Sequence, residues 1–243
     1  MATFVLVPGA WHGAWCWERV TPLLEAAGHR VLTPELLGMG EDRARAPAGG
    51  LAVWADQVAG LIAEQDAPVI LAGHSRGGAV ISEVAERVPD AIASLVYIAA
   101  LLLPDGTSIR DFLNATDDRA ETVIAPADDG TCSVAPEEVG PVFYTTTDPE
   151  WAARATSLVG PEPMASLATP IHVTAERFGR VPRAYIECTQ DLAVPLAAQQ
   201  RMRAQWPCDP VVTLDCDHSP FYSMPERLAE ALMRIAAGSN ASV

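Results

Sequence analysis

The sequence predicts an α/β protein in which helices cover both faces of a mostly parallel sheet. Short apolar runs alternate with longer segments whose apolar residues recur at helical spacing, which is the pattern of βαβ units. The strongest runs contain almost no polar residues, as expected of strands that are buried on both faces. With 243 residues, of which 49% are hydrophobic, the chain is long enough to bury a full core.

Six apolar runs are the expected strands. The strongest lie at residues 4–7, 69–72 and 95–99, and weaker candidates lie at 30–33, 184–188 and 211–214. The expected helices cover residues 17–27, 53–64, 79–88 and 226–236. In the last of these, Leu228, Ala231, Leu232 and Ile235 are spaced i, i+3, i+4 and i+7, so this apolar face should pack on the sheet.

One long segment departs from this alternation. Residues 104–180 are rich in Pro, Asp and Thr and contain no strand pattern that continues the sheet. We therefore expect a core formed by residues 1–103 and 181–243, with residues 104–180 inserted into it as a cap.

Composition excludes several classes of function. The 31 acidic residues outnumber the 16 basic ones, and a net charge of −15 repels nucleic acid and anionic lipid, so neither is an expected partner. All basic residues are arginine, which excludes Schiff-base chemistry and the phosphate-loop lysine. The five cysteines are scattered, without the spacing of a disulfide framework or a zinc site. We expect a cytoplasmic protein without metal or cofactor; no basic leader or membrane-length apolar run precedes or interrupts the predicted sheet.

The strongest local motif is the run from Gly73 to Gly77, Gly-His-Ser-Arg-Gly. It directly follows an expected strand and precedes an expected helix, which is the context of a nucleophile elbow. Glycines two residues on either side of Ser75 let strand and helix approach closely. The motif therefore predicts Ser75 as a nucleophile exposed at the carboxyl end of the sheet.

A serine nucleophile needs a general base and an acid that orients it. His218 follows a late expected strand and precedes the final helix, so it is the expected base. Asp191 comes just after the preceding strand and is the expected acid. His29 and His172 lack such a placement and are expected to be structural or to face solvent. The rival acids, expected to be solvated loop carboxylates, are Asp105, Asp215 and Asp217.

Acyl transfer also needs two backbone N–H donors for the oxyanion. The N–H of Arg76, directly after the nucleophile, is one candidate, and the N–H of Ala10 in the loop after the first strand is the other. The Arg76 side chain is expected to form a surface or interdomain ion pair. His12 could line a pocket, but a structural hydrogen bond within its loop is the more favoured expectation.

With these residues in place, the chain resembles serine hydrolases of the α/β-hydrolase fold. The resemblance is to the small branch that contains plant methylesterases, hydroxynitrile lyases and their bacterial esterase relatives. It rests on residues 4–17 and 23–31, on the elbow and on the two later catalytic segments. It implies a cap over the catalytic face, Asp191 and His218 as acid and base, and Ala10 and Arg76 at the oxyanion positions.

Two departures from the branch pattern are informative. The branch usually carries His-Gly where this chain has Pro8-Gly9, so the hydrogen bonds behind the loop must differ. The lyases carry threonine at the position of Gly9 and lysine at the position of Ser219. Without that cation a departing cyanide would meet no opposite charge, which disfavours the lyase activity.

The sequence thus predicts a serine hydrolase that cleaves a neutral, largely apolar carboxylic ester, lactone or carbamate through an acyl-enzyme on Ser75. A carbon-carbon bond hydrolase or cofactor-free oxygenase on the same scaffold, and a hydrolase-fold ligand-binding protein, stay open as alternatives. A homo-oligomer is compatible with the sequence but not predicted by it. Candidate pocket residues, each equally compatible with core packing, are Trp11, Phe112, Phe143, Tyr144, Trp151, Leu158, Met164 and Phe221.

Overall fold

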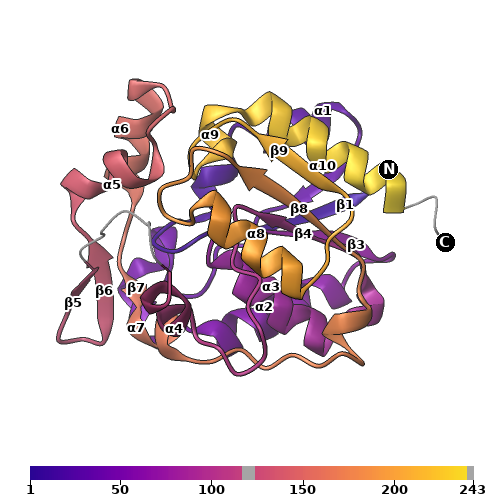
Figure 1. Ribbon diagram of the computed structural model, residues 1–243, viewed down its shortest axis with the longest axis horizontal. Helices are drawn as coiled ribbons and strands as arrows, with labels where there is room; N and C mark the ends of the chain where they lie inside the picture. Colours follow the sequence, from indigo (N-terminus) through magenta and orange to yellow (C-terminus); the bar gives the residue numbers. More distant parts are fainter. Residues whose placement is uncertain (117–123, 240–243) are drawn as a thin grey trace.

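A six-stranded parallel sheet runs through the centre of the molecule (Figure 1). The computed structural model describes residues 1–116 and 124–239. The strand order is β2-β1-β3-β4-β8-β9, and every neighbouring pair is parallel. The strands are β1 (Thr3–Val7), β2 (Arg30–Leu32), β3 (Val69–His74), β4 (Ile92–Ile98), β8 (Arg183–Cys188) and β9 (Val211–Leu214). All six predicted strands are confirmed.

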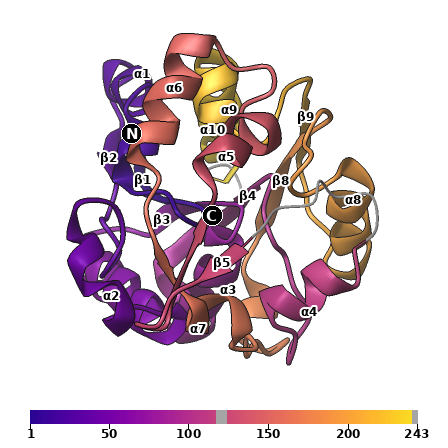
Figure 2. The same ribbon diagram turned by 90° about the vertical axis from the view of Figure 1, so that its left-hand side faces the viewer.

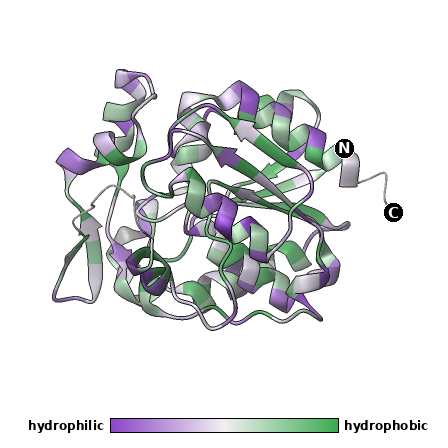
Figure 3. Cartoon of the chain, in the orientation of Figure 1, coloured by the Kyte–Doolittle hydropathy of each residue, from purple (hydrophilic) through white to green (hydrophobic). Residues whose placement is uncertain are grey.

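The inner strands form the core, and Figure 3 shows them as predominantly hydrophobic. Every residue of β3 is buried, as are Phe4 to Val7 of β1. The pattern of β8 was weaker in the sequence because this strand contains two charged residues, Arg183 and Glu187, although all six of its residues are buried. Nη2 of Arg183 donates to three backbone carbonyl groups, and Glu187 accepts from Arg203 and Thr213, so both charged ends have partners inside the protein. Nε of Arg183 is buried without a partner among the described residues.

Helices cover both faces of this sheet (Figure 1). On one face lie α1 (Thr21–Ala26) and α10 (Pro225–Ser239), and on the other α2 (Leu51–Ala63), α3 (Gly77–Arg87) and α8 (Leu196–Gln205). The sequence analysis did not identify α8, because it buries little more than Ala198, Gln199 and Met202 and so has no apolar periodicity. The remaining helical segments are the 3₁₀ helices η1 (Ala14–Trp17), η2 (Gly40–Ala48), η3 (Pro89–Ala91) and η4 (Phe178–Arg180) and the short α-helix α9 (Pro220–Ser223).

Most of the expected cap, residues 104–180, lies over the carboxyl ends of the central strands (Figures 1 and 2), but residues 172–178 lie against α3, where they bond Glu83, Glu86 and Arg87. Its helices are α4 (Ile109–Asn114), α5 (Pro136–Phe143), α6 (Pro149–Leu158) and α7 (Met164–Ala168), and its strands are β5 (Ile124–Pro126), β6 (Thr131–Val134) and β7 (Glu162–Pro163). In the described part of the chain these three strands pair antiparallel with one another and not with the central sheet. Over residues 1–116 and 124–239, no helix is long and apolar enough to cross a lipid bilayer.

Candidate active site

Ser75 occupies a sharp turn between the end of β3 and the start of α3. Its φ of 50° is in the left-handed region, which is strained for a residue with a side chain. A Cβ atom on Gly73 would lie 2.6 Å from the carbonyl oxygen of Gly77, and one on Gly77 would lie 2.8 Å from the carbonyl oxygens of Val7 and Pro8. Both positions therefore require glycine. Glycine there lets the backbones of β3, α3 and the loop after β1 approach closely, which places Ser75 at the carboxyl end of the sheet.

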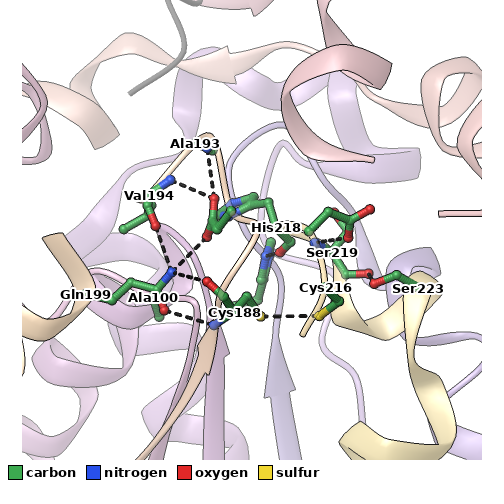
Figure 4. A network of polar contacts seen from close by, with 12 residues as sticks. Ala100, Cys188, Ala193, Val194, Gln199, Cys216, His218, Ser219 and Ser223 are labelled. Carbon is green, nitrogen blue, oxygen red and sulfur yellow. Dashed lines mark hydrogen bonds and ion pairs between the residues drawn. The ribbon is translucent and has the colours of Figure 1, made fainter. Parts of the chain in front are cut away.

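The structure brings His218 and Asp191 together behind this turn. Nδ1 of His218 lies 2.7 Å from Oδ2 of Asp191, and both side chains are almost completely buried. Oδ1 of Asp191 accepts the backbone N–H groups of Ala193 and Val194, each at 2.8 Å (Figure 4). Because the carboxylate accepts from Nδ1–H, the other ring nitrogen, Nε2, is the one left to accept a proton.

A buried glutamine holds the acid from behind. The side chain of Gln199 in α8 donates to Oδ2 of Asp191 at 3.2 Å and to the Val194 carbonyl oxygen at 2.7 Å (Figure 4). It also exchanges two 3.2 Å hydrogen bonds with the backbone of Cys188, at the end of β8. Gln199 thus ties the strand and the loop of Asp191 into one unit, a role that no sequence motif indicated.

Two backbone N–H groups next to Ser75 have no protein acceptor. Within residues 1–116 and 124–239, neither the N–H of Ala10 nor that of Arg76 donates a hydrogen bond to another residue. Ala10, Ser75 and Arg76 line the same cavity. Acceptor-free N–H groups beside a serine nucleophile are what an oxyanion hole requires.

The Arg76 side chain is buried between the core and the cap. Its Nε donates to Oε1 of Glu162 in β7 at 3.1 Å, its Nη2 donates to the Gly9 carbonyl oxygen at 2.8 Å, and its guanidinium lies 4.3 Å from the ring centre of Trp54. Both charged side chains are at most 1% exposed. The predicted ion pair is therefore confirmed in its interdomain form, and the surface alternative is wrong. Its acidic partner, Glu162, was not identified from the sequence.

Two further histidines pack around His218. Nδ1 of His12 donates to the Ala10 carbonyl oxygen at 2.6 Å, and Nε2 accepts from the Tyr144 hydroxyl at 2.5 Å. Burial lowers the pKa of His12 from 6.5 to about 4, so the ring is neutral at pH 7. Nε2 of His74 donates to the His218 carbonyl oxygen at 2.8 Å, and burial lowers the pKa of His74 well below its usual value. His12 and His74 are therefore neutral supports of the oxyanion loop and of the base.

The predicted structural hydrogen bond of His12 within its loop is thus confirmed. His29 and His172 also lie as expected, one in a structural hydrogen bond and the other exposed to solvent. His29 accepts the N–H of Ala2 at 3.2 Å, and the His172 side chain is exposed.

Among the rival acids, Asp217 does not lie where the sequence predicted. It was expected to be a solvated loop carboxylate, but it is completely buried. It accepts the Thr146 N–H at 2.9 Å, the Thr147 hydroxyl at 2.8 Å and the Ser219 N–H at 3.0 Å. The cap covers this carboxylate, which sequence adjacency to His218 could not indicate. Asp105 and Asp215 are exposed, as expected.

A cavity of about 50 Å³ opens at Ser75. Trp11 and Phe143, two of the predicted pocket residues, line it. The other apolar walls come from the core and the cap: Leu101, Ile109, Leu113, Ile124 and Leu167. This volume has room for the reacting group of a substrate but is far smaller than typical ligand pockets of about 300–1,000 Å³.

The other predicted pocket residues lie outside the lining of this cavity: Phe112, Tyr144, Trp151, Leu158, Met164 and Phe221. Tyr144 and Phe221 pack around the histidines, with the Phe221 ring edge-on to His74 at 5.0 Å. Trp151 packs against Tyr222, with 5.1 Å between ring centres and the ring planes inclined by 51°. Met164 lines a second cavity, of about 280 Å³. The sequence could not separate these packing roles from substrate contact.

The comparisons with known proteins agree with this geometry. Residues 4–231 match the model of the alpha/beta hydrolase family. The chain belongs to this family. It is 34% identical over 247 residues to a pyrethroid hydrolase of Sphingobium wenxiniae, covering 96% of this chain and 86% of that protein. It is 31% identical over 251 residues to methylesterase 7 of Arabidopsis thaliana, covering 96% and 95%. A crystal structure of a pyrethroid hydrolase matches with a TM-score of 0.87 at 31% identity, covering 98% of both chains.

These relatives confirm the resemblance to methylesterases and bacterial esterases of the α/β hydrolase family. Neither the binding-protein nor the carbon-carbon hydrolase alternative is favoured by them. The environment of Ser219, directly after the base, also argues against lyase chemistry in this α/β hydrolase. Its N–H donates to the carboxylate of Asp217, so the position carries an acidic neighbour in place of the cation that cyanide would need.

Proposed function

We propose that this α/β hydrolase is a serine esterase that cleaves neutral, largely apolar carboxylic esters through an acyl-enzyme on Ser75. One observation carries the proposal: Ser75 stands in a strained elbow beside two acceptor-free N–H groups, with a hydrogen-bonded His218–Asp191 pair at the same end of the sheet. The hydrolase and methylesterase names of its relatives support the same reaction class.

The geometry supports a two-step mechanism. Nε2 of His218 takes the hydroxyl proton as Oγ of Ser75 attacks the acyl carbon, and the N–H groups of Ala10 and Arg76 stabilise the oxyanion. His218 then gives the proton to the leaving alcohol. Water attacks the acyl-enzyme with His218 again as base and releases the acid. Asp191 keeps the proton on Nδ1 and stabilises the positively charged imidazolium.

The walls of the site favour a neutral substrate. The cavity at Ser75 is lined mostly by apolar side chains, and the net charge of −15 repels anions from the protein surface. Lactones and carbamates present the same electrophilic carbonyl carbon and are the second choice of substrate. The five cysteines are free, including Cys188 and Cys216, whose sulfur atoms lie 3.7 Å apart, and free thiols support a reducing, cytoplasmic setting. The acidic charge supports small-molecule substrates in place of nucleic acid or membrane partners.

The test compares the wild-type protein with Ser75→Ala on a panel of short- and medium-chain aryl esters. Ser94→Ala is the matched control, because Ser94 is a buried serine on β4 whose hydroxyl, within the described part of the chain, bonds only the carbonyl group of the next residue. Each protein is then exposed to a serine-directed fluorophosphonate and analysed by mass spectrometry. We expect one adduct on Ser75, and turnover that is abolished in Ser75→Ala but kept in Ser94→Ala.

Two other outcomes would redirect the assignment. An adduct on Ser75 without ester turnover would contradict the proposed substrate class and lead to lactones and carbon-carbon substrates. The absence of both adduct and turnover would contradict Ser75 as nucleophile and favour a binding protein.

A further inference from the structure

One buried carboxylate of the cap contacts both sides of the oxyanion hole. Glu162 is completely buried in β7. Its Oε2 accepts the Trp11 N–H at 2.7 Å, and its Oε1 accepts from Nε of Arg76 at 3.1 Å and from the Ser166 hydroxyl at 2.6 Å. Trp11 directly follows one proposed oxyanion donor, Ala10, and Arg76 is the other. The mechanism described above does not use Glu162.

The Arg76 side chain orients the Ala10 N–H, the oxyanion donor in the loop after β1. Its Nη2 donates to the carbonyl oxygen of Gly9, which belongs to the same peptide group as the Ala10 N–H. Because a trans peptide is planar, its C=O and N–H point in opposite directions. A guanidinium that holds the Gly9 C=O therefore fixes the Ala10 N–H in the opposite direction, away from the Arg76 side chain, and the Ala10 N–H has no acceptor among the described residues. Arg76 keeps this orientation only while Glu162 compensates its buried charge.

The next peptide group is fixed at both of its polar ends. Its carbonyl oxygen, on Ala10, accepts from His12, and its N–H, on Trp11, donates to Glu162. Trp11 has a φ of 61°, in the left-handed region that a tryptophan rarely adopts. The Trp11 carbonyl oxygen in turn accepts the N–H of Gly160 at 3.0 Å, so the cap segment 160–162 holds this residue from both sides.

We infer, resting on the proposed function, that Glu162 is a positioning residue of the oxyanion hole. Through Arg76 it orients the Ala10 N–H, and through the Trp11 N–H it fixes the loop that carries this donor. The oxyanion hole is complete only when the cap is seated on the core. The cap is then part of the catalytic geometry as well as a cover for the substrate.

The test uses Glu162→Gln, whose amide oxygen can replace one carboxylate oxygen but whose NH₂ group cannot accept a hydrogen bond in place of the other. The matched control is Glu83→Gln, because Glu83 is also a largely buried carboxylate that joins core to cap, through the His172 N–H at 2.7 Å. We expect kcat of Glu162→Gln on an aryl ester to fall by about 100-fold, with KM within about threefold, as for loss of one oxyanion donor. In Glu83→Gln, kcat per folded protein should stay within about twofold of wild type.

A transition-state analogue separates positioning from a merely structural role. A trifluoromethyl ketone forms a hemiketal when Oγ of Ser75 adds to its carbonyl carbon, which places an oxyanion in the hole. Its affinity should fall by the same factor as kcat/KM in Glu162→Gln and stay unchanged in Glu83→Gln. If Glu162→Gln folds poorly, the double variant Arg76→Gln/Glu162→Gln removes both charges of this ion pair and should show the same losses of kcat and of analogue affinity.

The inference is overturned if kcat of Glu162→Gln falls no more than that of Glu83→Gln, if only KM changes, or if analogue affinity is unaffected. Labelling of Ser75 by the fluorophosphonate separates this failure from failure of the proposed function. A wild-type protein that is not labelled contradicts the esterase itself. Equal labelling rates in wild type and Glu162→Gln contradict only the role of Glu162.

Discussion

The buried, neutral His12 makes stability depend on pH in a way that can be calculated. Its pKa is about 4 in the folded protein against 6.5 when exposed, because burial penalises the charged ring. Between these values the unfolded chain binds a proton that the folded protein does not, so the free energy of unfolding falls as the pH decreases through this window. Well above pH 6.5, His12 is neutral in both the folded and the unfolded state, so this loss of stability is absent.

The expected size follows from the two pKa values. Lowering the pH from 7.5 to 5.0 should remove about 2 kcal/mol of stability through His12 alone. That is a large part of the roughly 5–15 kcal/mol by which proteins of this kind are stable. A lower limit of pH 5.0 keeps the protein above its isoelectric point of about 4.6, where self-association would interfere.

The assay compares urea unfolding of wild type and His12→Gln at pH 7.5, 6.5, 5.75 and 5.0. Glutamine does not titrate, so the difference between the two curves isolates His12 from the buried His74 and from the carboxylates. Wild type should lose about 2 kcal/mol more than His12→Gln over this range. Parallel curves, within about 0.5 kcal/mol, would refute the assignment of a depressed pKa to His12.

Two further predictions concern the acid and its support. Asp191→Asn should lower kcat by about 10⁴-fold with a nearly unchanged melting temperature, because asparagine no longer keeps the proton on Nδ1 of His218; a loss below tenfold in steady-state assays would contradict this role. Gln199→Leu should destabilise the protein by about 2–4 kcal/mol in urea unfolding, because it removes the buried hydrogen bonds that Gln199 makes to Cys188, Val194 and Asp191. A change below about 0.5 kcal/mol would show that these groups find other partners.

The parts of the site that follow local rules could be predicted from the sequence. Glycines at positions 73 and 77 mark the elbow because a Cβ atom at either would collide with backbone. Residues that follow β8 and β9 lie at the same end of the sheet as Ser75 because the carboxyl ends of parallel strands share one edge of the sheet. Strand pattern and chain order were therefore enough to propose Ser75, Asp191 and His218.

The residues that the sequence analysis missed act through contacts between distant segments. Glu162 meets Trp11 across 151 residues of sequence, and Thr147 meets Asp217 across 70. Such pairs depend on how the cap is seated, and no periodicity or spacing encodes that. Gln199 lies on a helix whose buried face is small and partly polar, so a hydrophobic pattern could not distinguish it from an exposed glutamine.

The two neighbouring cavities have a consequence for how selectivity can change. Leu113, Ile124 and Leu167 line both the cavity at Ser75 and the larger one beside it, so these side chains form a partition. Replacing one of them with alanine would join the two spaces without altering the elbow, the acid or the base. The size of the group that fits beside Ser75 can therefore diverge by one substitution, while Ser75, Asp191 and His218 are inherited unchanged.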